Sequence, residues 1–291
     1  MRNDDPGGSR PPPGRSRNAN EARGAKPAHE RLSHARHDRV HVAREPEQRL
    51  HGVNACRAAF AQRSQDLRKV WLTEANILAF KPVLAWCVQH RIGYRVVAEE
   101  DLQRLTGSSH HEGVCFDLRM PSTITLDGLL GRIANDAPAL LLWPNGIGNP
   151  HNLGAILRSA AHFGVSGVLL PQHGAALLSG AAYRVAEGGA EAVPVVRVAD
   201  TDAAFAHLRR AGFVVAATVV RDGEPLYAAT MPARLLLLLG AESEGLPERL
   251  STISDLRLRI PGSGAVESLN VSVAAALCIA EWTRVHARAA S

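Results

Sequence analysis

The sequence predicts an α/β protein built on a mostly parallel sheet. Near-continuous apolar runs such as "ALLLW" (139–143) and "RLLLLL" (234–239) have the composition of strands that are buried on both faces. Segments with helical spacing lie between such runs, for example at 152–163 and 201–211. Strands that alternate with helices along a chain form parallel sheets, because each helix returns the chain to the same edge.

Residues 1–45 are expected to be a disordered basic tail. The first 50 residues carry 11 Arg and Lys against 7 Asp and Glu, whereas the other 241 residues carry 22 against 21. A segment this rich in Pro, Gly and Arg buries too little apolar surface to offset the entropy of ordering. The tail either adds non-specific attraction to nucleic acid or is a solvated extension without a role.

Residues 46–120 are expected to form a small α/β domain, followed by a linker over 121–137. The predicted elements are a strand leading into a helix over 50–63, a strand over 68–73, a mostly helical 76–91 with Pro82 near its start, a strand over 94–98, a helix over 99–107 closed by Gly107, and a strand over 113–119. Within the linker we expect one short helix, from Leu126 to Ile133.

Residues 138–291 are expected to hold the parallel sheet. The predicted strands are 139–143, 165–170, 193–198, 213–220, 234–239 and 256–260, and the predicted helices are 152–163, 175–187, 201–211, a short one from Pro247, and one from about Leu269 to Ala289. The last helix has an apolar seam at helical spacing: Val271, Ala274, Cys278, Trp282 and Val285. Its apolar surface exceeds one face, so we expect it to be buried or to lie in an oligomer interface.

Composition excludes several classes of protein. No run of 18 uncharged apolar residues occurs, and the N-terminus has no apolar signal segment, so we expect neither a membrane span nor a secretory signal. The four cysteines are far apart and form no C-x-x-C pair. We therefore expect a reduced cytoplasmic protein without structural zinc.

The first unusual loop, "PNGIGNPHNLGAILRSA", follows the strand 139–143. A dinucleotide-binding G-x-G-x-x-G fails because its third glycine would fall on His151, and no Gly-Lys-Ser/Thr of a P-loop follows. Asn152 is either a helix cap or a site residue. Arg158 is either a surface residue or, with Gly154 one turn before it and His162 one turn after it, an anion-binding group.

Two further loops follow the strands at 234–239 and 256–260. In "GAESEGLPERL", Gly240 lets a ligand or another backbone come close, and Gly245 permits a tight turn. Glu242 and Glu244 either orient a neighbour such as Arg158 or are solvated. "PGSGAVESLN" ends with Ser268 and Asn270, which are either helix caps or site residues. Because the carboxyl ends of parallel strands share one edge, the three loops predict one site.

Together these loops resemble the SpoU/TrmH family of S-adenosylmethionine-dependent RNA ribose 2′-O-methyltransferases, over residues 138–288. The matches, in order, are N-x-G-x-x-x-R at Asn152, Gly154 and Arg158, G-x-E-x-x-G at Gly240, Glu242 and Gly245, and I-P followed by S-L-N-V-S at Ile260, Pro261 and Ser268 to Ser272. The resemblance implies methyl transfer from S-adenosylmethionine to a ribose 2′-OH of structured rRNA or tRNA. No metal is implied, because the sulfonium is itself electrophilic.

The resemblance also implies a fold and an assembly. The family has a deep C-terminal trefoil knot (the SPOUT type), which general topological rules do not predict, and forms homodimers, here through the last helix. Residues 46–120 look like its L30e-like RNA substrate-binding domain, whose terminal H-Q-G-V is "HEGV" here, His111 to Val114. The "HHEG" pair suggests metal ligands, but entry into the last strand of the domain is favoured.

The roles of the site residues are likewise implied by the resemblance. The catalytic set is Asn152, Arg158, Glu242, Ser268 and Asn270, and the cofactor lies against backbone from Thr218, Gly240, Ile260 and Leu269. Arg158 is expected to hold a substrate phosphate and stabilise the developing alkoxide, because an always-protonated Arg is a poor base. Glu242 would hold Arg158, and the remaining three would position the ribose or the loops.

One departure from the family and two alternatives stand beside this hypothesis. The cofactor loop reads "PGSGAVE" instead of "PM-x-G-x-V", so that Gly262 alters its stiffness and Glu267 adds negative charge. A catalytically idle RNA-binding or assembly protein is one alternative, against which the intact motif residues argue. A nucleotide- or NAD-binding enzyme is the other, against which the missing third glycine argues.

Overall fold

The computed structural model describes residues 46–172, 178–241 and 244–286. The predictions for the tail (1–45), for Glu242, for 175–177 and for the end of the last helix (287–289) lie outside these residues. We call residues 46–120 the N-terminal module and residues 138–286 the C-terminal module.

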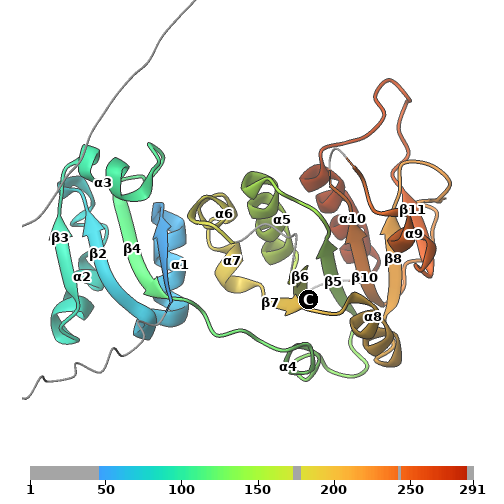
Figure 1. The fold of residues 1–291 in the computed structure, drawn as a ribbon, viewed down its shortest axis with the longest axis horizontal. Helices are drawn as coiled ribbons and strands as arrows, with labels where there is room; N and C mark the ends of the chain where they lie inside the picture. Colours follow the sequence, from blue (N-terminus) through green and yellow to red (C-terminus); the bar gives the residue numbers. More distant parts are fainter. Residues whose placement is uncertain (1–45, 173–177, 242–243, 287–291) are drawn as a thin grey trace, which may run out of the picture. The chain divides into compact units, whose positions relative to one another are not determined.

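The N-terminal module is a four-stranded mixed sheet with helices (Figure 1). Its elements are β1 (Glu47–His51), α1 (Val53–Arg63), the 3-10 turn η1 (Ser64–Asp66), β2 (Leu67–Leu72), the 3-10 turn η2 (Glu74–Asn76), α2 (Lys81–Gln89), β3 (Gly93–Val96), α3 (Glu99–Thr106) and β4 (Val114–Arg119). The strand order is β1-β4-β2-β3, with only the β2–β3 pair parallel. A short helix, α4 (Leu126–Leu130), follows, and Thr125 caps it.

The C-terminal module is built on a seven-stranded sheet in which every recorded strand pair is parallel. Its strands are β5 (Ala139–Pro144), β6 (Gly167–Pro171), β7 (Val195–Val198), β8 (Val214–Thr218), β9 (Glu224–Pro225), β10 (Arg234–Leu239) and β11 (Leu256–Arg259), in the order β7-β6-β5-β10-β8-β11-β9. Its helices are α5 (Pro150–His162), α6 (Gly180–Ala186), α7 (Gly189–Ala192), α8 (Thr201–Arg210), α9 (Glu248–Thr252) and α10 (Val271–His286). The mostly parallel α/β fold is thus confirmed.

Both faces of the seven-stranded sheet are buried, which explains the continuous apolar runs. Alternate residues of β5 point to opposite faces: Leu140 and Leu142 pack in one core with α5 and α10, whereas Leu141 and Trp143 pack in a second core with α8. The ring of Trp143 meets that of Phe205 edge-on at 5.1 Å in the second core. A strand that is covered on both sides has no solvent-exposed face, so its sequence does not alternate between apolar and polar residues.

Element boundaries differ from the predictions by a few residues where capping decides them. Helix α5 begins at Pro150, two residues early, because Asn149 caps it through the His151 N–H. Helix α10 begins at Val271 because Asn270 accepts the Ser272 N–H. The sequence did not indicate α7 or β9, each of which has only a few residues. No described helix is long and apolar enough to cross a membrane.

Candidate functional site

Asn152 lies in the first turn of α5 but does not cap it. The capping oxygen belongs to Asn149, whose side chain accepts the N–H of His151 at 2.9 Å. The Asn152 side-chain oxygen instead accepts a hydrogen bond at 3.2 Å from the side-chain amide of Asn270. The capping alternative for Asn152 is therefore wrong, and the amide is available for contacts between elements.

Asn270 joins the starts of α10 and α5. Its side-chain oxygen accepts from the Ser272 N–H at 2.9 Å and from the Ser272 hydroxyl at 2.6 Å, while its amide donates to Asn152. The residue is thus both a cap and a link between two of the predicted loops, 118 positions apart in sequence. Both asparagines retain some exposure to solvent, so a ligand can reach them.

The second and third loops and the end of β8 enclose a pocket of about 760 Å³. All four residues expected to contact the cofactor line it: Thr218, Gly240, Ile260 and Leu269. Ser268 lines it too, and Asn270 follows these lining residues directly in the chain. The volume falls within the range of about 300–1,000 Å³ that is typical of small-molecule sites.

The glycine at 240 is required by a neighbouring backbone. A β-carbon there would lie 2.2 Å from the Leu246 nitrogen and 2.3 Å from the carbonyl carbon of Gly245. The loop folds back through two hydrogen bonds between Ala241 and Gly245, and Gly245 has a left-handed φ of 68°. Of the two alternatives for Gly240, close approach of another backbone is the one observed, and it shapes one wall of the pocket.

Charged groups of both signs line the pocket. Glu244 and Glu267 contribute carboxylates, and Arg221 and Arg259 contribute guanidinium groups. The Glu267 carboxylate, the charge that departs from the family pattern, lies 3.5 Å from the Arg221 guanidinium, and both side chains are exposed. The Thr218 hydroxyl donates to the Leu238 carbonyl at 2.9 Å, which ties β8 to β10 beside the pocket. A ligand that carries both charges matches this lining.

Arg158 does not line this pocket. Its side chain is 59% exposed, and its Nη1 donates to the Glu187 carboxylate at 2.9 Å, just past the end of α6. Gly154, one turn earlier, is buried: a β-carbon there would lie 2.6 Å from the Ala182 carbonyl oxygen, so this glycine lets α6 pack on α5. The pairing of Arg158 with Glu242 is untested, because Glu242 lies outside the described residues.

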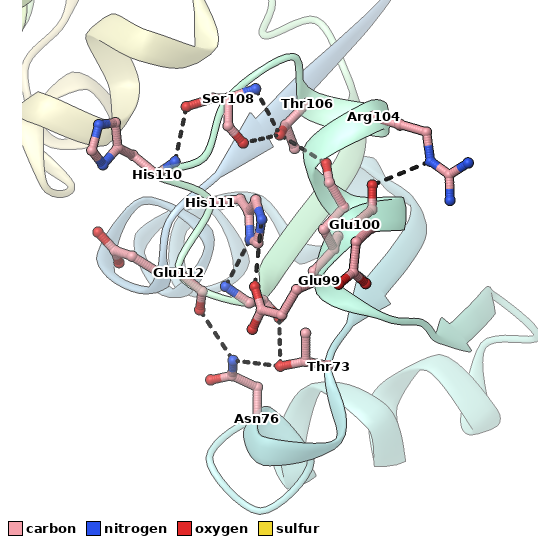
Figure 2. A network of polar contacts seen from close by, with 12 residues as sticks. Thr73, Asn76, Glu99, Glu100, Arg104, Thr106, Ser108, His110, His111 and Glu112 are labelled. Atoms are coloured by element: carbon pink, nitrogen blue, oxygen red, sulfur yellow. Dashed lines mark hydrogen bonds and ion pairs between the residues drawn. The ribbon is translucent and has the colours of Figure 1, made fainter.

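The "HHEG" segment builds a turn in the N-terminal module, and Figure 2 shows its contacts. The Nδ1 of buried His111 accepts the Gly113 N–H at 3.1 Å, and its Nε2 lies 3.5 Å from the Glu99 carboxylate. The carbonyl oxygen of Glu112 accepts from the Asn76 amide at 3.0 Å. Within the described ranges no group of three or more His, Cys, Asp or Glu has an arrangement that could hold a metal ion.

The four cysteines are free, buried thiols. Burial raises the pKa of Cys87 to about 11 and those of Cys115 and Cys278 to about 12, and it raises the pKa of Cys56 as well. A thiol must lose its proton to act as a nucleophile. These residues are therefore packing groups at neutral pH.

Sequence reasoning missed two kinds of residue near the site. The pocket includes Val219 and Val220, which follow β8; their position after a buried parallel strand was the signal that could have found them. Glu187, the partner of Arg158, had no such signal, because its carboxylate reaches Arg158 only through the packing of α6 on α5.

Two family models match the chain in adjacent segments. Residues 49–123 match the model described as RNA 2′-O ribose methyltransferase substrate binding, and residues 139–280 match the SpoU rRNA Methylase family. The first match spans most of the N-terminal module and the second most of the C-terminal module.

Individual proteins agree with these matches. An uncharacterised tRNA/rRNA methyltransferase of Escherichia coli O157:H7 is 39% identical over 83% of this chain and 69% of its own length. A 23S rRNA (guanosine-2′-O-)-methyltransferase of Nitrosomonas europaea is 36% identical over 66% of this chain and 74% of its own. The solved structure of an AdoMet-bound rRNA methyltransferase from Sinorhizobium meliloti has the same fold, with a TM-score of 0.68 at 22% identity over 82% of this chain and 87% of that one.

Proposed function

The chain belongs to the SpoU rRNA methylase family and is an S-adenosylmethionine-dependent RNA ribose 2′-O-methyltransferase; we propose that it methylates structured rRNA or tRNA at the pocket beside Asn270. The observation that carries this choice of site is the meeting of Thr218, Gly240, Ile260 and Leu269 around one pocket, with the Asn152–Asn270 pair next to it. These residues come from loops far apart in the chain.

The pocket suits S-adenosylmethionine in size and charge. The molecule carries a sulfonium, an ammonium and a carboxylate, and the lining holds two carboxylates and two guanidinium groups. Loop backbone from Gly240, Ile260 and Leu269 would lie against it, and glycines at 262 and 264 leave the wall open. When bound, the group supplies an electrophilic methyl on sulfur, a chemistry that calls for no metal.

The chain's own residues would position the acceptor oxygen and manage its charge. Asn152, Ser268 and Asn270 offer amide and hydroxyl groups to a ribose, and holding two reactants in line accounts for a large part of such rate enhancements. Arg158 would bind a neighbouring phosphate through its fork of N–H groups and stabilise the developing alkoxide. The proton would leave to phosphate or water, since Arg stays protonated. Glu242 would orient the protonated Arg158 side chain.

A homodimer through α10 is part of the proposal. Val273 is 48% exposed and Val285 is 44% exposed, while Ala276, Leu277 and Ala280 between them are only partly covered. Apolar surface on a helix of this length is what a partner subunit would bury. Because Arg158 and the pocket are apart within one chain, assembly with a second copy offers a route to a complete site.

We also propose the trefoil knot and a cytoplasmic location. The insertion of β10 between β5 and β8 is consistent with a chain that passes through a loop of its own, and the family resemblance supplies the knot itself. Four buried free thiols fit the reducing cytoplasm, where rRNA and tRNA are found.

The test is transfer of labelled methyl from S-adenosylmethionine to total RNA from cells that lack this protein. Wild type should produce label that resists alkaline hydrolysis at the modified linkage, and Arg158→Ala should lose at least about 100-fold in rate, as removal of an alkoxide-stabilising group does. S-adenosylmethionine binding should persist in the variant. Absence of binding in the wild type would favour an idle RNA-binding protein, and label that does not resist alkali would exclude ribose methylation.

A further inference from the structure

The carboxylate of Glu187 lies between the arginine of the first motif and the N-terminal module. Its Oε1 accepts from Nη1 of Arg158 at 2.9 Å, and its Oε2 accepts from Nδ2 of Asn54 at 3.2 Å. Asn54 belongs to α1, whereas Arg158 belongs to α5. One side chain therefore contacts both modules, with one oxygen committed to each.

The backbone around Glu187 fixes this placement. Helix α6 ends at Ala186, and Glu187 adopts a left-handed φ of 47°, which is uncommon for a residue with a β-carbon. Gly188 and Gly189 follow; a β-carbon on Gly189 would lie 2.6 Å from the Leu157 carbonyl oxygen and 3.0 Å from the Arg158 Cα. The turn that carries Glu187 thus rests directly on the backbone of Arg158.

The ion pair between Arg158 and Glu187 contributes more to the orientation of Arg158 than to the stability of the fold. The Arg158 and Glu187 side chains are 59% and 41% exposed, and ion pairs this exposed add little to the free energy of unfolding. Glu187 is the only hydrogen-bond partner of the Arg158 side chain among the described residues, and it occupies one of five guanidinium N–H donors. In that part of the chain the other donors meet no second acceptor.

We propose that Glu187 is a positioning residue for Arg158, and that Asn54 ties this position to the docking of the N-terminal module. The proposal rests on the proposed methyl-transfer function, in which Arg158 must meet a phosphate and the ribose oxygen. An arginine already aimed at the ribose oxygen can stabilise the developing alkoxide without reorienting in the transition state, so the effect falls on kcat. Asn54 holds the second carboxylate oxygen of Glu187. The orientation of Arg158 therefore depends on contact between the N-terminal module and the turn after α6.

The first arm of the test is kinetic. Glu187→Ala should lower kcat for methyl transfer to total RNA about 10-fold, while the half-saturating RNA concentration and S-adenosylmethionine affinity change less than about twofold. Glu187→Gln, which keeps a hydrogen-bond acceptor, should recover part of the loss. Asn54→Ala should lower kcat about threefold and add nothing to Glu187→Ala, since both act through one carboxylate.

The matched control is Asp202→Ala, which removes the carboxylate from another exposed ion pair, with Arg249. It should leave kcat unchanged. A wild-type kcat in Glu187→Ala, or a loss confined to the half-saturating RNA concentration, would overturn the positioning role.

The second arm does not depend on activity. Phenylglyoxal labels accessible arginines, and peptide mass spectrometry can follow Arg158 and Arg249 in the same sample. Glu187→Ala should raise the labelling rate of Arg158 at least about threefold and leave that of Arg249 unchanged; Asp202→Ala should do the reverse. An unchanged Arg158 rate refutes the proposal, whereas a raised rate in a protein that transfers no methyl would count against the proposed function alone.

Discussion

At the scale of single residues, Asn270 combines two tasks that a sequence motif cannot separate. Its oxygen caps α10 through the Ser272 N–H, and its amide reaches Asn152 on α5. The cap serves stability, whereas the link serves the arrangement of the site. A substitution that keeps the cap on α10 and removes the link to Asn152 can separate the two tasks.

Asn270→Ser makes that separation, because a serine oxygen caps a helix as well as asparagine but is too short to reach Asn152. We expect Asn270→Ser to keep its Tm within about 2 °C of wild type and to lose roughly 10-fold in methyl transfer. Asn270→Ala should lose the cap as well, at a cost of about 1 kcal/mol. Calorimetry and initial rates test this; full transfer by the serine variant would refute a role for the link.

At the scale of secondary-structure elements, the ends of β8, β10 and β11 produce the pocket. Parallel strands end at one edge of the sheet, so the loops that follow them meet there. Each loop then takes its shape from its own glycines. The loop after β10 folds back on itself through Ala241 and Gly245, and the backbone of Gly240 lies against this fold.

Gly240→Ala should therefore disturb the pocket, since its β-carbon would meet the backbone atoms of Gly245 and Leu246 at 2.2–2.6 Å. Overpacking of this kind costs about 1–3 kcal/mol, so S-adenosylmethionine affinity should fall about 10-fold or more by titration calorimetry. Gly262→Ala is the control: Gly262 lines the same pocket, but a β-carbon there meets nothing within 4 Å. Equal affinities for the two variants would show that the close approach at Gly240 is irrelevant to the site.

At the scale of the whole molecule, the two modules contact each other through buried polar groups. Arg63 of α1 donates two hydrogen bonds to Glu191 of α7, at 2.8 and 2.9 Å, and both side chains are less than 10% exposed. Nearby, His51 at the end of β1 packs on Gly180 at the start of α6, where a β-carbon would lie 3.1 Å from its ring. Removing one member of such a buried pair leaves the other uncompensated, so this contact is sensitive to charge.

His51 makes stability depend on pH at this contact. Burial, then the charges of Arg184 and His111, lower its pKa below 6.5, and Glu112 opposes them in part. The unfolded chain takes up the proton first as pH falls, so the stabilisation by neutral His51 is present above about pH 6.5 and is lost as pH falls through the folded-state pKa.

From pH 7.5 to 5.0 the Tm of wild type should fall more than that of His51→Gln, which cannot titrate. The difference should correspond to at most about 1.4 kcal/mol per pH unit. The two proteins share every other titratable group, so the difference between their Tm curves reports His51 and its charge interactions. Parallel Tm curves would mean that His51 keeps its ordinary pKa in the folded chain.

The sequence by itself determined the class of fold, the order of the longer elements and the three loops of the candidate site. These depend on local features: apolar periodicity marks strands and helices, and Gly, Pro and Asn mark where they end. The same features explain why α5 and α10 were found with errors of only about two residues at their starts. The rule that parallel strands end at a common edge predicted that the three loops would form one site. The family resemblance supplied Thr218, Gly240, Ile260 and Leu269, which line one pocket.

Only the tertiary structure decided which side chains are partners. Asn152 bonds Asn270 from 118 positions away, and Arg158 bonds Glu187, which no motif marked. The tertiary structure also explains why two motif positions need glycine. Helix α6 lies against Gly154 and the loop backbone lies against Gly240, so neither position has room for a β-carbon. Such contacts depend on how helices and loops pack in three dimensions, and local periodicity carries no information about the distance between residues remote in the chain.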